Sequence, residues 1–361
     1  MIINKFDSKY KFRSVFNTRT GFYVRSGVME NGIDTGIDPF MASFPELIDI
    51  GIMGHCAHGL SGKCKESGVQ CYQHGDISKN ANMTLEDYKS VIDECKGKTF
   101  QVALGGCGDP DMHPDFEEII RYTREANIVP NFTTSGFGMT KEKAELCKMY
   151  CGSVAVSWYR SKYTTDTIEL LLNCNVQTNV HFVLGRNTID EALDLLTNRN
   201  GKSFPRGINA VIFLLHKPVG LGEVDNVLDT KDPRVMELFR ILDTETFEFK
   251  VGFDSCSIPG IINFMNTVDY VSVDTCEAAR WSMYITPDMI GLPCSFDNQS
   301  KLFGVNIKEV GSIQAVWDSE QFGRIRNTFK TRCKECPKHR YCLGGCPLME
   351  VITLCDRGER K

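Results

Sequence analysis

The sequence predicts an α/β protein built on a parallel sheet, with a smaller cysteine-rich segment after it. Between about residues 47 and 251, six strand-like apolar runs alternate with six amphipathic helical stretches. Most of the 16 cysteines fall in two bursts, at residues 56–71 and 276–355. Alternating β and α units are typical of a parallel sheet with helices outside, either open or closed into a partial barrel. In such folds the chemistry lies at the carboxyl ends of the strands.

The elements of this repeat follow one another in a regular order. Thr84 followed by Asp87 suits a helix N-terminus, and Thr188 followed by Asp190 and Glu191 suits another. The expected strands are 47–52, 100–104, 128–132, 153–158, 177–184 and 209–215. The expected helices are 84–95, 116–126, 141–149, 166–172, 189–196 and 233–242.

Residues 1–46 differ from the repeat because they are aromatic and basic. Turn signals at Thr20–Gly21 and Asn31–Gly32 predict a short hairpin laid against the sheet. The alternative is an edge strand that docks a peptide. We therefore expect an N-terminal extension at 1–46, a core at 47–250 and a cysteine-rich domain at 251–361.

Composition excludes several classes of protein. The chain has 361 residues, enough for about two domains, and 41 basic against 46 acidic residues give a net charge of −5. This acidity argues against nucleic acid as a partner. No apolar run reaches the ~18 residues of a membrane helix, and the N-terminus lacks a signal-peptide core, so we expect no membrane association and a cytoplasmic location. Cysteines in such a chain are more often metal ligands than disulfides.

The C-terminal cysteines have the strongest pattern. They follow the spacing C-x2-C-x5-C-x3-C-x8-C, and two more cysteines bracket a predicted strand–turn–strand at 281–286 and 290–292. Thiolates at such intervals hold iron–sulfur clusters or zinc. Seven cysteines are too many for one zinc and too few for two four-cysteine sites, and Cys256 would complete two. The seven are Cys276, Cys294, Cys333, Cys336, Cys342, Cys346 and Cys355.

A second group follows the first predicted strand of the repeat. Cys56, Cys64 and Cys71 have the spacing C-x7-C-x6-C, and glycines within this segment supply the turns that a long loop needs. The three cysteines are candidate ligands of an iron–sulfur cluster. The alternative is zinc, bound by these cysteines and one of His55, His58 and His74.

The C-terminal pattern resembles the SPASM extension of radical S-adenosylmethionine enzymes, although the family's glycine-x4-cysteine step is shortened to Gly291-Leu-Pro-Cys294. The resemblance implies two auxiliary [4Fe–4S] clusters. It assigns Cys276, Cys294 and Cys346 to the first, with Cys256 as a plausible fourth ligand; without Cys256, one iron would be open for substrate. It assigns Cys333, Cys336, Cys342 and Cys355 to the second. A zinc ribbon over residues 333–346 is the alternative.

The same resemblance covers residues 47–355 and implies a radical S-adenosylmethionine core, a partial (β/α)6 TIM-type barrel with a small SPASM extension. Cys56, Cys64 and Cys71 would then hold the radical cluster, although the family's usual spacing is C-x3-C-x2-C. The iron left without a cysteine would bind S-adenosylmethionine, and the reduced cluster would release a 5′-deoxyadenosyl radical. The implied cofactors are S-adenosylmethionine and three [4Fe–4S] clusters.

The rim of the barrel supplies the implied cofactor contacts. Gly105 and Gly106 precede Cys107 and Asp109 in a turn that resembles the family's glycine–glycine–acidic–proline turn, with Asp109 nearest to the usual glutamate. Cys107 is a candidate hydrogen-atom donor, with simple packing as the alternative. Residues 218–222 resemble the family's rim loop. Further contacts are expected from Thr134, Ser135 and Ser157.

The resemblance fixes the class of reaction better than the substrate. It implies a radical enzyme that takes hydrogen from a ribosomally made peptide and forms a thioether or carbon–carbon crosslink. Peptide epimerisation and a sulfatase-maturase-like oxidation are the enzymatic alternatives, and a non-catalytic iron–sulfur or zinc scaffold is an alternative of another class. The implied partners are the precursor peptide and an external electron donor such as flavodoxin or ferredoxin.

Overall fold

A computed structural model describes residues 1–298 and 300–355 and contains one large mixed sheet. Within these residues the sheet has ten strands in the order β12-β11-β10-β9-β8-β7-β6-β13-β14-β15. The run from β6 to β12 is parallel and keeps the order of the chain, as expected for a partial barrel. These strands are β6 (Leu47–Met53), β7 (Gln101–Gly106), β8 (Val129–Thr134), β9 (Val154–Ser157), β10 (Thr178–Leu184), β11 (Ala210–Leu215) and β12 (Lys250–Phe253).

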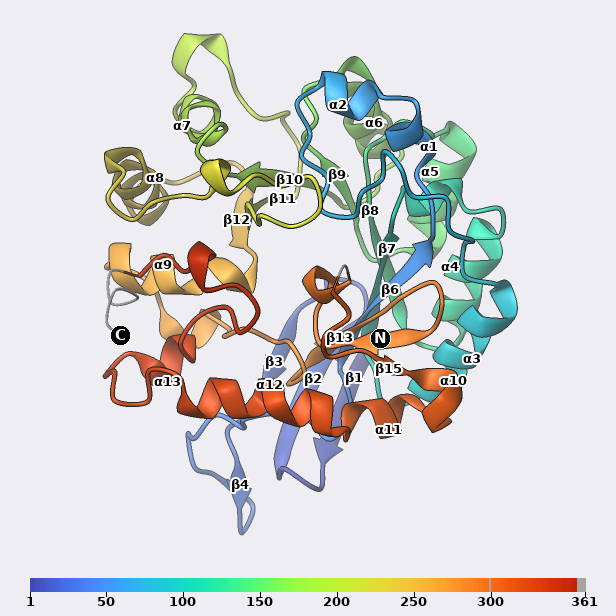
Figure 1. Cartoon of the computed structure of the whole chain (residues 1–361), viewed down its shortest axis with the longest axis vertical. Coiled ribbons are helices and arrows are strands. Elements are labelled where there is room, and N and C mark those ends of the chain that lie inside the picture. The colour runs from blue at the N-terminus through green and yellow to red at the C-terminus, as the bar shows by residue number, and fades with distance from the viewer. Residues whose placement is uncertain (299, 356–361) are drawn as a thin grey trace.

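Helices separate the parallel strands and lie outside the sheet (Figure 1). The six expected strands and six expected helices are confirmed. Thr84 accepts a hydrogen bond from the backbone N–H of Asp87 at 3.1 Å and caps α3, whereas the Thr188 hydroxyl bonds Gly185 and leaves α7 without a side-chain cap. The helices are α3 (Leu85–Cys95), α4 (Phe116–Glu125), α5 (Lys141–Tyr150), α6 (Lys162–Asn173), α7 (Ile189–Thr197) and α8 (Pro233–Thr244).

The two faces of the sheet differ in burial. Along β6, Ile48 and Ile50 face the helices and are fully buried, whereas Asp49 between them is partly exposed. Successive strand residues point to opposite faces, so the partly exposed positions define an inner face. This inner face carries polar residues among apolar ones such as Leu47 and Ile212. Its polar residues are Asp49, Gln101, Asn131, Thr133, Ser157, Asn179 and His181.

The C-terminal region completes the sheet at the other side of β6. β13 (Ser282–Ile285) pairs with β6 in parallel, and β14 (Ile290–Leu292) and β15 (Val305–Asn306) continue in antiparallel fashion. The expected strand–turn–strand is confirmed. β12 begins at Lys250, so the expected boundary between residues 250 and 251 falls at the start of a core strand. Residues 356–361 of the expected C-terminal domain lie outside the described residues. Its helices are α9 (Ile258–Phe264), α10 (Ile307–Val310), α11 (Ile313–Trp317), α12 (Glu320–Thr331) and α13 (His339–Cys342).

The N-terminal segment forms more than the single hairpin expected from its turns. β1 (Ile2–Asp7), β2 (Phe12–Asn17) and β3 (Tyr23–Arg25) make an antiparallel sheet, followed by a hairpin of β4 (Met29–Glu30) and β5 (Ile33–Asp34). Phe16 stacks on Phe100 at 5.3 Å between ring centroids, directly before β7. Phe12 meets Trp281 edge-on at 5.3 Å, directly before β13. The segment therefore covers the amino ends of the barrel strands, away from the rim where chemistry is expected.

In the part of the chain that the structure describes, none of the helices has both the length and the apolar character needed to cross a membrane.

Candidate active site

The first cysteine group lies on a loop that leaves the carboxyl end of β6. Two short helical turns, α1 (Ala57–Leu60) and α2 (Lys63–Glu66), take up the long spacing between the cysteines. Cys56 caps α1, and its Sγ accepts a hydrogen bond from the backbone N–H of Gly59 at 3.1 Å. Cys64 lies within α2. The turns fold the loop back on itself, so the extra residues do not separate the thiols.

Cys56 and Cys71 both lie close to Gly75. A Cβ atom built on Gly75 would lie 3.7 Å from Cys56 Sγ and 3.5 Å from Cys71 Sγ. Burial raises the pKa of Cys56 to about 12, and the charges of Asp109, Cys107 and Cys71 add to the rise. Burial followed by the charge of Cys71 raises the pKa of Cys64. A metal bound beside these thiols would stabilise their thiolates.

Polar atoms without partners surround this group. Among the described residues, Gln73 Nε2, His74 Nδ1 and Asp76 Oδ1 are buried and make no hydrogen bond. A buried polar atom without a partner costs about 1–3 kcal/mol. A polar cofactor beside Cys71 would supply those partners, so the residues present fit a cluster that carries a polar ligand.

Two of the histidines considered as zinc ligands have other partners. His58 is 2% exposed, stacks on Phe137, and its Nε2 shares a hydrogen bond of 2.8 Å with the Tyr163 hydroxyl. His55 Nδ1 lies 3.2 Å from the Asn80 carbonyl oxygen. In residues 1–298 and 300–355, no three His, Cys, Asp or Glu side chains have the spacing of a single-metal site.

The glycine-rich turn after β7 packs against this loop. A Cβ on Gly108 would lie 2.4 Å from the His55 carbonyl oxygen, so only glycine allows the approach. By contrast, Gly105 faces open space, with no atom within 4 Å of its Cβ position. Cys107 is 8% exposed, and its thiol donates to the Gln73 carbonyl oxygen at 3.4 Å. Burial raises the pKa of Cys107 to about 11.

Two residues expected to contact the cofactor bond each other. Asp109 accepts hydrogen bonds of 2.6 Å from both the backbone N–H and the hydroxyl of Ser135, and both residues are buried. Burial and the charge of Asp111 raise the pKa of Asp109 to about 6. The pair joins the turns that follow β7 and β8. Thr134 is 1% exposed and accepts from the backbone N–H of Gly136, whereas Ser157 is partly exposed on the inner face.

A second cysteine group gathers between β12, β14 and the C-terminal segment. Its members are Cys256, Cys276, Cys294 and Cys346. The neighbouring Cys346 thiol and burial raise the pKa of Cys256. Burial and the charge of Cys256 raise the pKa of Cys276 to about 12. The pKa of Cys294 rises through burial and through the charges of Cys256 and Cys276. The structure thus brings Cys256 together with the three cysteines that the sequence assigns to the first auxiliary cluster.

Cys333, Cys336, Cys342 and Cys355 form a third group. The backbone N–H of Cys336 donates to Cys333 at 2.8 Å, and Cys342 ends the short helix α13. Burial raises the pKa of Cys342, and the charges of Cys336, Cys355 and Cys333 add to it. The tight turns in residues 333–355 bring together cysteines as far apart in the sequence as Cys342 and Cys355. All four assigned to the second auxiliary cluster lie in one neighbourhood.

A buried lysine beside the second group was missed by the sequence analysis. Lys217 is 6% exposed, forms an ion pair with Asp254, and has its Nζ 4.5 Å from the ring centroid of Phe296. Burial alone would lower the pKa of Lys217, but the charges of Asp254, Cys256 and Cys294 outweigh it and raise that pKa. The only sequence signal was its position at the end of a strand, directly before the rim loop.

The same rim loop reaches the first cysteine group. The backbone N–H of Leu221 donates to the Cys71 carbonyl oxygen at 2.9 Å. Gln70 Oε1 accepts from Asn226 Nδ2 at 3.2 Å and from the backbone N–H of Glu223 at 3.3 Å. Residues 217–226 therefore touch both the loop that carries Cys56, Cys64 and Cys71 and the second group.

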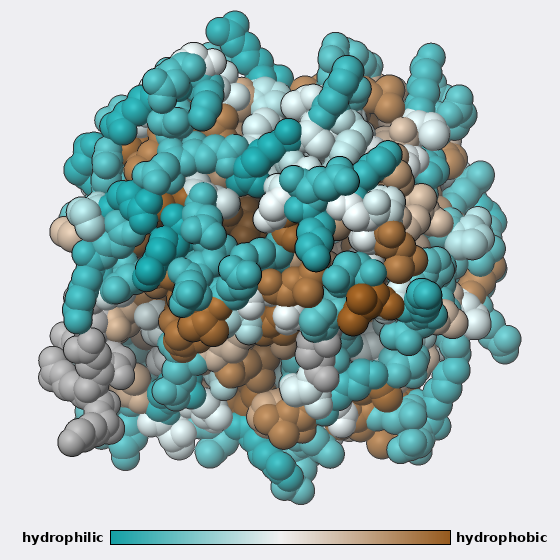
Figure 2. Space-filling model, turned by 45° about the horizontal axis from the view of Figure 1, so that its top comes forward, coloured by the Kyte–Doolittle hydropathy of each residue, from teal (hydrophilic) through white to brown (hydrophobic). Residues whose placement is uncertain are grey.

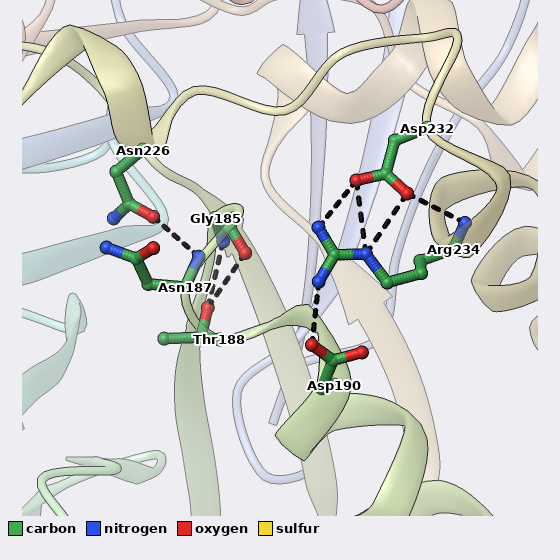
Figure 3. A network of polar contacts seen from close by, with 7 residues as sticks. All are labelled: Gly185, Asn187, Thr188, Asp190, Asn226, Asp232 and Arg234. Atoms are coloured by element: carbon green, nitrogen blue, oxygen red, sulfur yellow. Dashed lines mark hydrogen bonds and ion pairs between the residues drawn. The ribbon is translucent and has the colours of Figure 1, made fainter.

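Figure 3 shows how the rest of the molecule holds this loop. Asn226 Oδ1 accepts from the backbone N–H of Asn187 at 2.8 Å, which ties the loop to the turn after β10. Arg234 of α8 bonds Asp232 at 2.7 Å and Asp190 of α7 at 2.6 Å.

Figure 2 brings the side with α1, α2 and α7 toward the viewer, and apolar side chains gather near the middle of this face between hydrophilic borders.

Comparison with known proteins gives relatives of one kind. No protein-family model matches the chain. The chain is 23% identical over 330 residues to the mycofactocin maturase MftC of Mycolicibacterium smegmatis, which covers 81% of this chain and 78% of the relative. The MftC of Mycobacterium tuberculosis H37Rv is 20% identical over 322 residues, with the same coverage.

Solved structures share the fold. Streptococcus suis SuiB superposes with a TM-score of 0.67 at 13% identity, over 96% of this chain and 94% of SuiB. SuiB bound to S-adenosylmethionine gives 0.64 at 16% identity, over 85% and 74%. The enzyme anSMEcpe with bound AdoMet gives 0.57 at 16% identity, over 84% and 86%. The chain is thus similar in sequence to the MftC maturases and shares its fold with SuiB and anSMEcpe.

Proposed function

We propose that the chain crosslinks a ribosomally made peptide through a thioether or carbon–carbon bond, using three [4Fe–4S] clusters. The observation that carries this proposal is the gathering of eleven cysteines into groups of three, four and four. The group of three leaves one iron open, and the groups of four saturate theirs. SuiB has been solved with its precursor peptide SuiA, which supports a peptide as the substrate.

S-adenosylmethionine would bind where Cys56, Cys64 and Cys71 meet the rim. When bound, the reduced cluster and S-adenosylmethionine supply a 5′-deoxyadenosyl radical that takes a hydrogen atom from the peptide. The open side of Gly105 admits the cofactor, and the buried Asp109–Ser135 pair fixes the rim turns beside it. Gln73, His74 and Asp76 would then gain the partners that they lack among the described residues.

The second cysteine group would serve as an electron acceptor rather than as a holder of substrate. Cys256 supplies a fourth thiol beside Cys276, Cys294 and Cys346, so no iron of that cluster is left for a substrate thiolate. Lys217 offsets part of the negative charge of this group. Electrons would enter and leave through an external carrier such as flavodoxin or ferredoxin, and we place the enzyme in the cytoplasm with its precursor peptide.

Epimerisation of a peptide residue is the second candidate, and Cys107 favours it. Its thiol is buried beside Cys71 and keeps its proton, because burial raises its pKa to about 11. A protonated thiol at this place would return a hydrogen atom to a peptide radical. Crosslinking remains the first candidate, because two complete auxiliary groups suit a net oxidation.

Iron analysis of the anaerobically reconstituted protein tests the cluster assignment. We expect about twelve irons, and about eight after Cys56, Cys64 and Cys71 are all changed to Ala. Cys256→Ala lowers the iron content or changes the absorption spectrum without any peptide. Unchanged iron and spectrum in Cys256→Ala, together with a wild-type spectrum that responds to a thiol-bearing peptide, would contradict Cys256 as the fourth ligand of that cluster.

Mass spectrometry of a treated precursor separates a crosslink, which changes mass by hydrogen loss, from epimerisation, which leaves mass unchanged.

A further inference from the structure

Asp49 of β6 and Tyr284 of β13 are register partners in neighbouring parallel strands. Paired residues of adjacent strands point to the same face, so both belong to the inner face of the sheet. The Tyr284 ring extends along β6, because a Cβ on Gly51 would lie 2.2 Å from its hydroxyl oxygen. Glycine at position 51 thus makes room for the phenol, which reaches from Asp49 toward the carboxyl rim.

Both side chains have unused hydrogen-bonding capacity. Tyr284 is 3% exposed, and its buried hydroxyl has no hydrogen-bond partner among the described residues. Asp49 makes no hydrogen bond or ion pair within 1–298 and 300–355. Asp109 and Asp254, by contrast, are paired with Ser135 and with Lys217. An orphaned buried phenol beside an unpaired carboxyl indicates a ligand that supplies the missing contacts.

A second carboxyl lies in the same neighbourhood. Glu277 makes no side-chain hydrogen bond or ion pair in the part of the chain that the structure describes, and the charge of Asp49 contributes to its raised pKa. Nearby cations are engaged elsewhere. Arg25 binds Asp274 through two N–H groups at 2.7 and 2.8 Å, and Arg280 donates to the Phe40 carbonyl oxygen at 2.7 Å. The charges of Arg25 and Arg280 act on Glu277, but among the described residues neither arginine forms an ion pair with Asp49 or Glu277.

The position of this group suits a substrate rather than a structural ion. The charge of Cys107, on the rim turn after β7, adds to the raised pKa of Tyr284. The charge of Asp49 in turn adds to the raised pKa of Cys294, in the second cysteine group. Asp49 and Tyr284 thus lie on the inner face, and the Tyr284 hydroxyl extends along β6 toward the rim where the radical cluster is proposed.

We propose that Asp49, Tyr284 and Glu277 bind the cationic side chain of a lysine or arginine in the substrate peptide. An ammonium group has three N–H donors, which match two carboxylates and one phenol oxygen. Hydrogen bonds between ionised groups are about twice as strong as neutral ones. The inference rests on the proposed function for its peptide substrate, and it names the side chain held on the inner face.

Peptide binding to the reconstituted protein with S-adenosylmethionine tests this inference. The probes are peptides of the form acetyl-Gly-Gly-X-Gly-Gly-amide, with X as lysine, arginine, glutamine, norleucine or glutamate, measured by equilibrium dialysis. We expect the lysine or arginine peptide to bind about tenfold more tightly than the norleucine peptide. A difference of about tenfold in Kd is what one charge-assisted hydrogen bond contributes. Asp49→Asn abolishes the preference and Tyr284→Phe reduces it. A wild-type protein with no cationic preference overturns the inference.

The matched control is Asp166→Asn, at an exposed carboxylate that pairs with Lys162 on α6. We expect Asp166→Asn to keep the preference for cationic peptides. An Asp49→Asn protein that also keeps this preference contradicts the assignment of Asp49 to the binding site. Iron content and far-ultraviolet circular dichroism establish that each variant is folded. Formation of 5′-deoxyadenosine by the wild type separates the two claims, because a protein that binds the lysine peptide but never forms this product contradicts only the proposed function.

Discussion

Lys217 forms a buried ion pair with Asp254, two residues before Cys256. The lysine side chain is 4% exposed and the aspartate side chain 16%. Asp254 also accepts from the backbone N–H of Leu215 at 3.1 Å and from the Ser257 hydroxyl at 2.8 Å. The pair therefore ties β11, the rim loop and the segment of Cys256 together.

Lys217→Met leaves the Asp254 carboxylate buried without its cation. Breaking a buried pair from one side costs about 3–5 kcal/mol, and we expect Tm to fall by at least about 5 °C. The double variant Lys217→Met with Asp254→Asn recovers part of the loss, because no unpaired charge remains. Differential scanning calorimetry measures both. A double variant as unstable as the sum of the two single variants would show that the residues do not interact.

Gly75→Ala places a methyl group in the space between Cys56 and Cys71. The added Cβ would lie 3.2 Å from Cys56 Cβ and 3.5 Å from Cys71 Sγ. We expect the variant to lose about a third of its iron while its fold is kept, since one cluster of three is affected. Gly323→Ala on α12 is the control, because its Cβ position is open. Full iron content in Gly75→Ala would refute the placement of the radical cluster there.

Much of this architecture follows from the sequence because apolar periodicity reports which residues are buried. The apolar run at residues 47–52 predicts β6, and Thr84 marks the start of α3. Periodicity does not say which strands pair. The contact of β13 with β6, which brings Tyr284 beside Asp49, joins segments far apart in the chain. The sequence does not predict β12 as a strand, because its four residues include a glycine and carry little pattern.

The cysteine assignments rest on spacing along the chain, which does not decide every ligand. Spacing left open whether Cys256 joins the first auxiliary group, and the fold brings it to Cys346. No local signal marked Lys217 as buried, since a lysine after a strand is usually solvated. Its role depends on Asp254 and Cys256, which come from a later strand and turn.

His181 on the inner face predicts a pH dependence of stability. Burial lowers its pKa to about 4, below the value of about 6.5 in an unfolded chain. The neutral ring therefore stabilises the fold fully above about pH 6.5, and this contribution is lost as pH falls toward 4. The ring is partly reached by solvent, so we expect a loss of about 2 kcal/mol. His181→Gln has a smaller change in Tm between pH 7.5 and 4.5 than the wild type; equal changes would contradict this.

Cys342→Ala separates cofactor cleavage from product formation. The change removes one thiol of the third group and leaves Cys56, Cys64 and Cys71 intact. We expect 5′-deoxyadenosine to form while the modified peptide is reduced or lost, because electrons no longer leave through an intact second auxiliary cluster. Full formation of the modified peptide by this variant would show that the third group is dispensable.

Cleavage of S-adenosylmethionine by the reduced, anaerobic protein tests the central claim most directly. We expect chromatography with mass spectrometry to detect 5′-deoxyadenosine from the wild type, and none from the variant with Cys56, Cys64 and Cys71 changed to Ala. Cleavage that survives in the triple variant, or its absence from a wild-type protein with about twelve irons, would contradict the assignment of the radical cluster to these three cysteines.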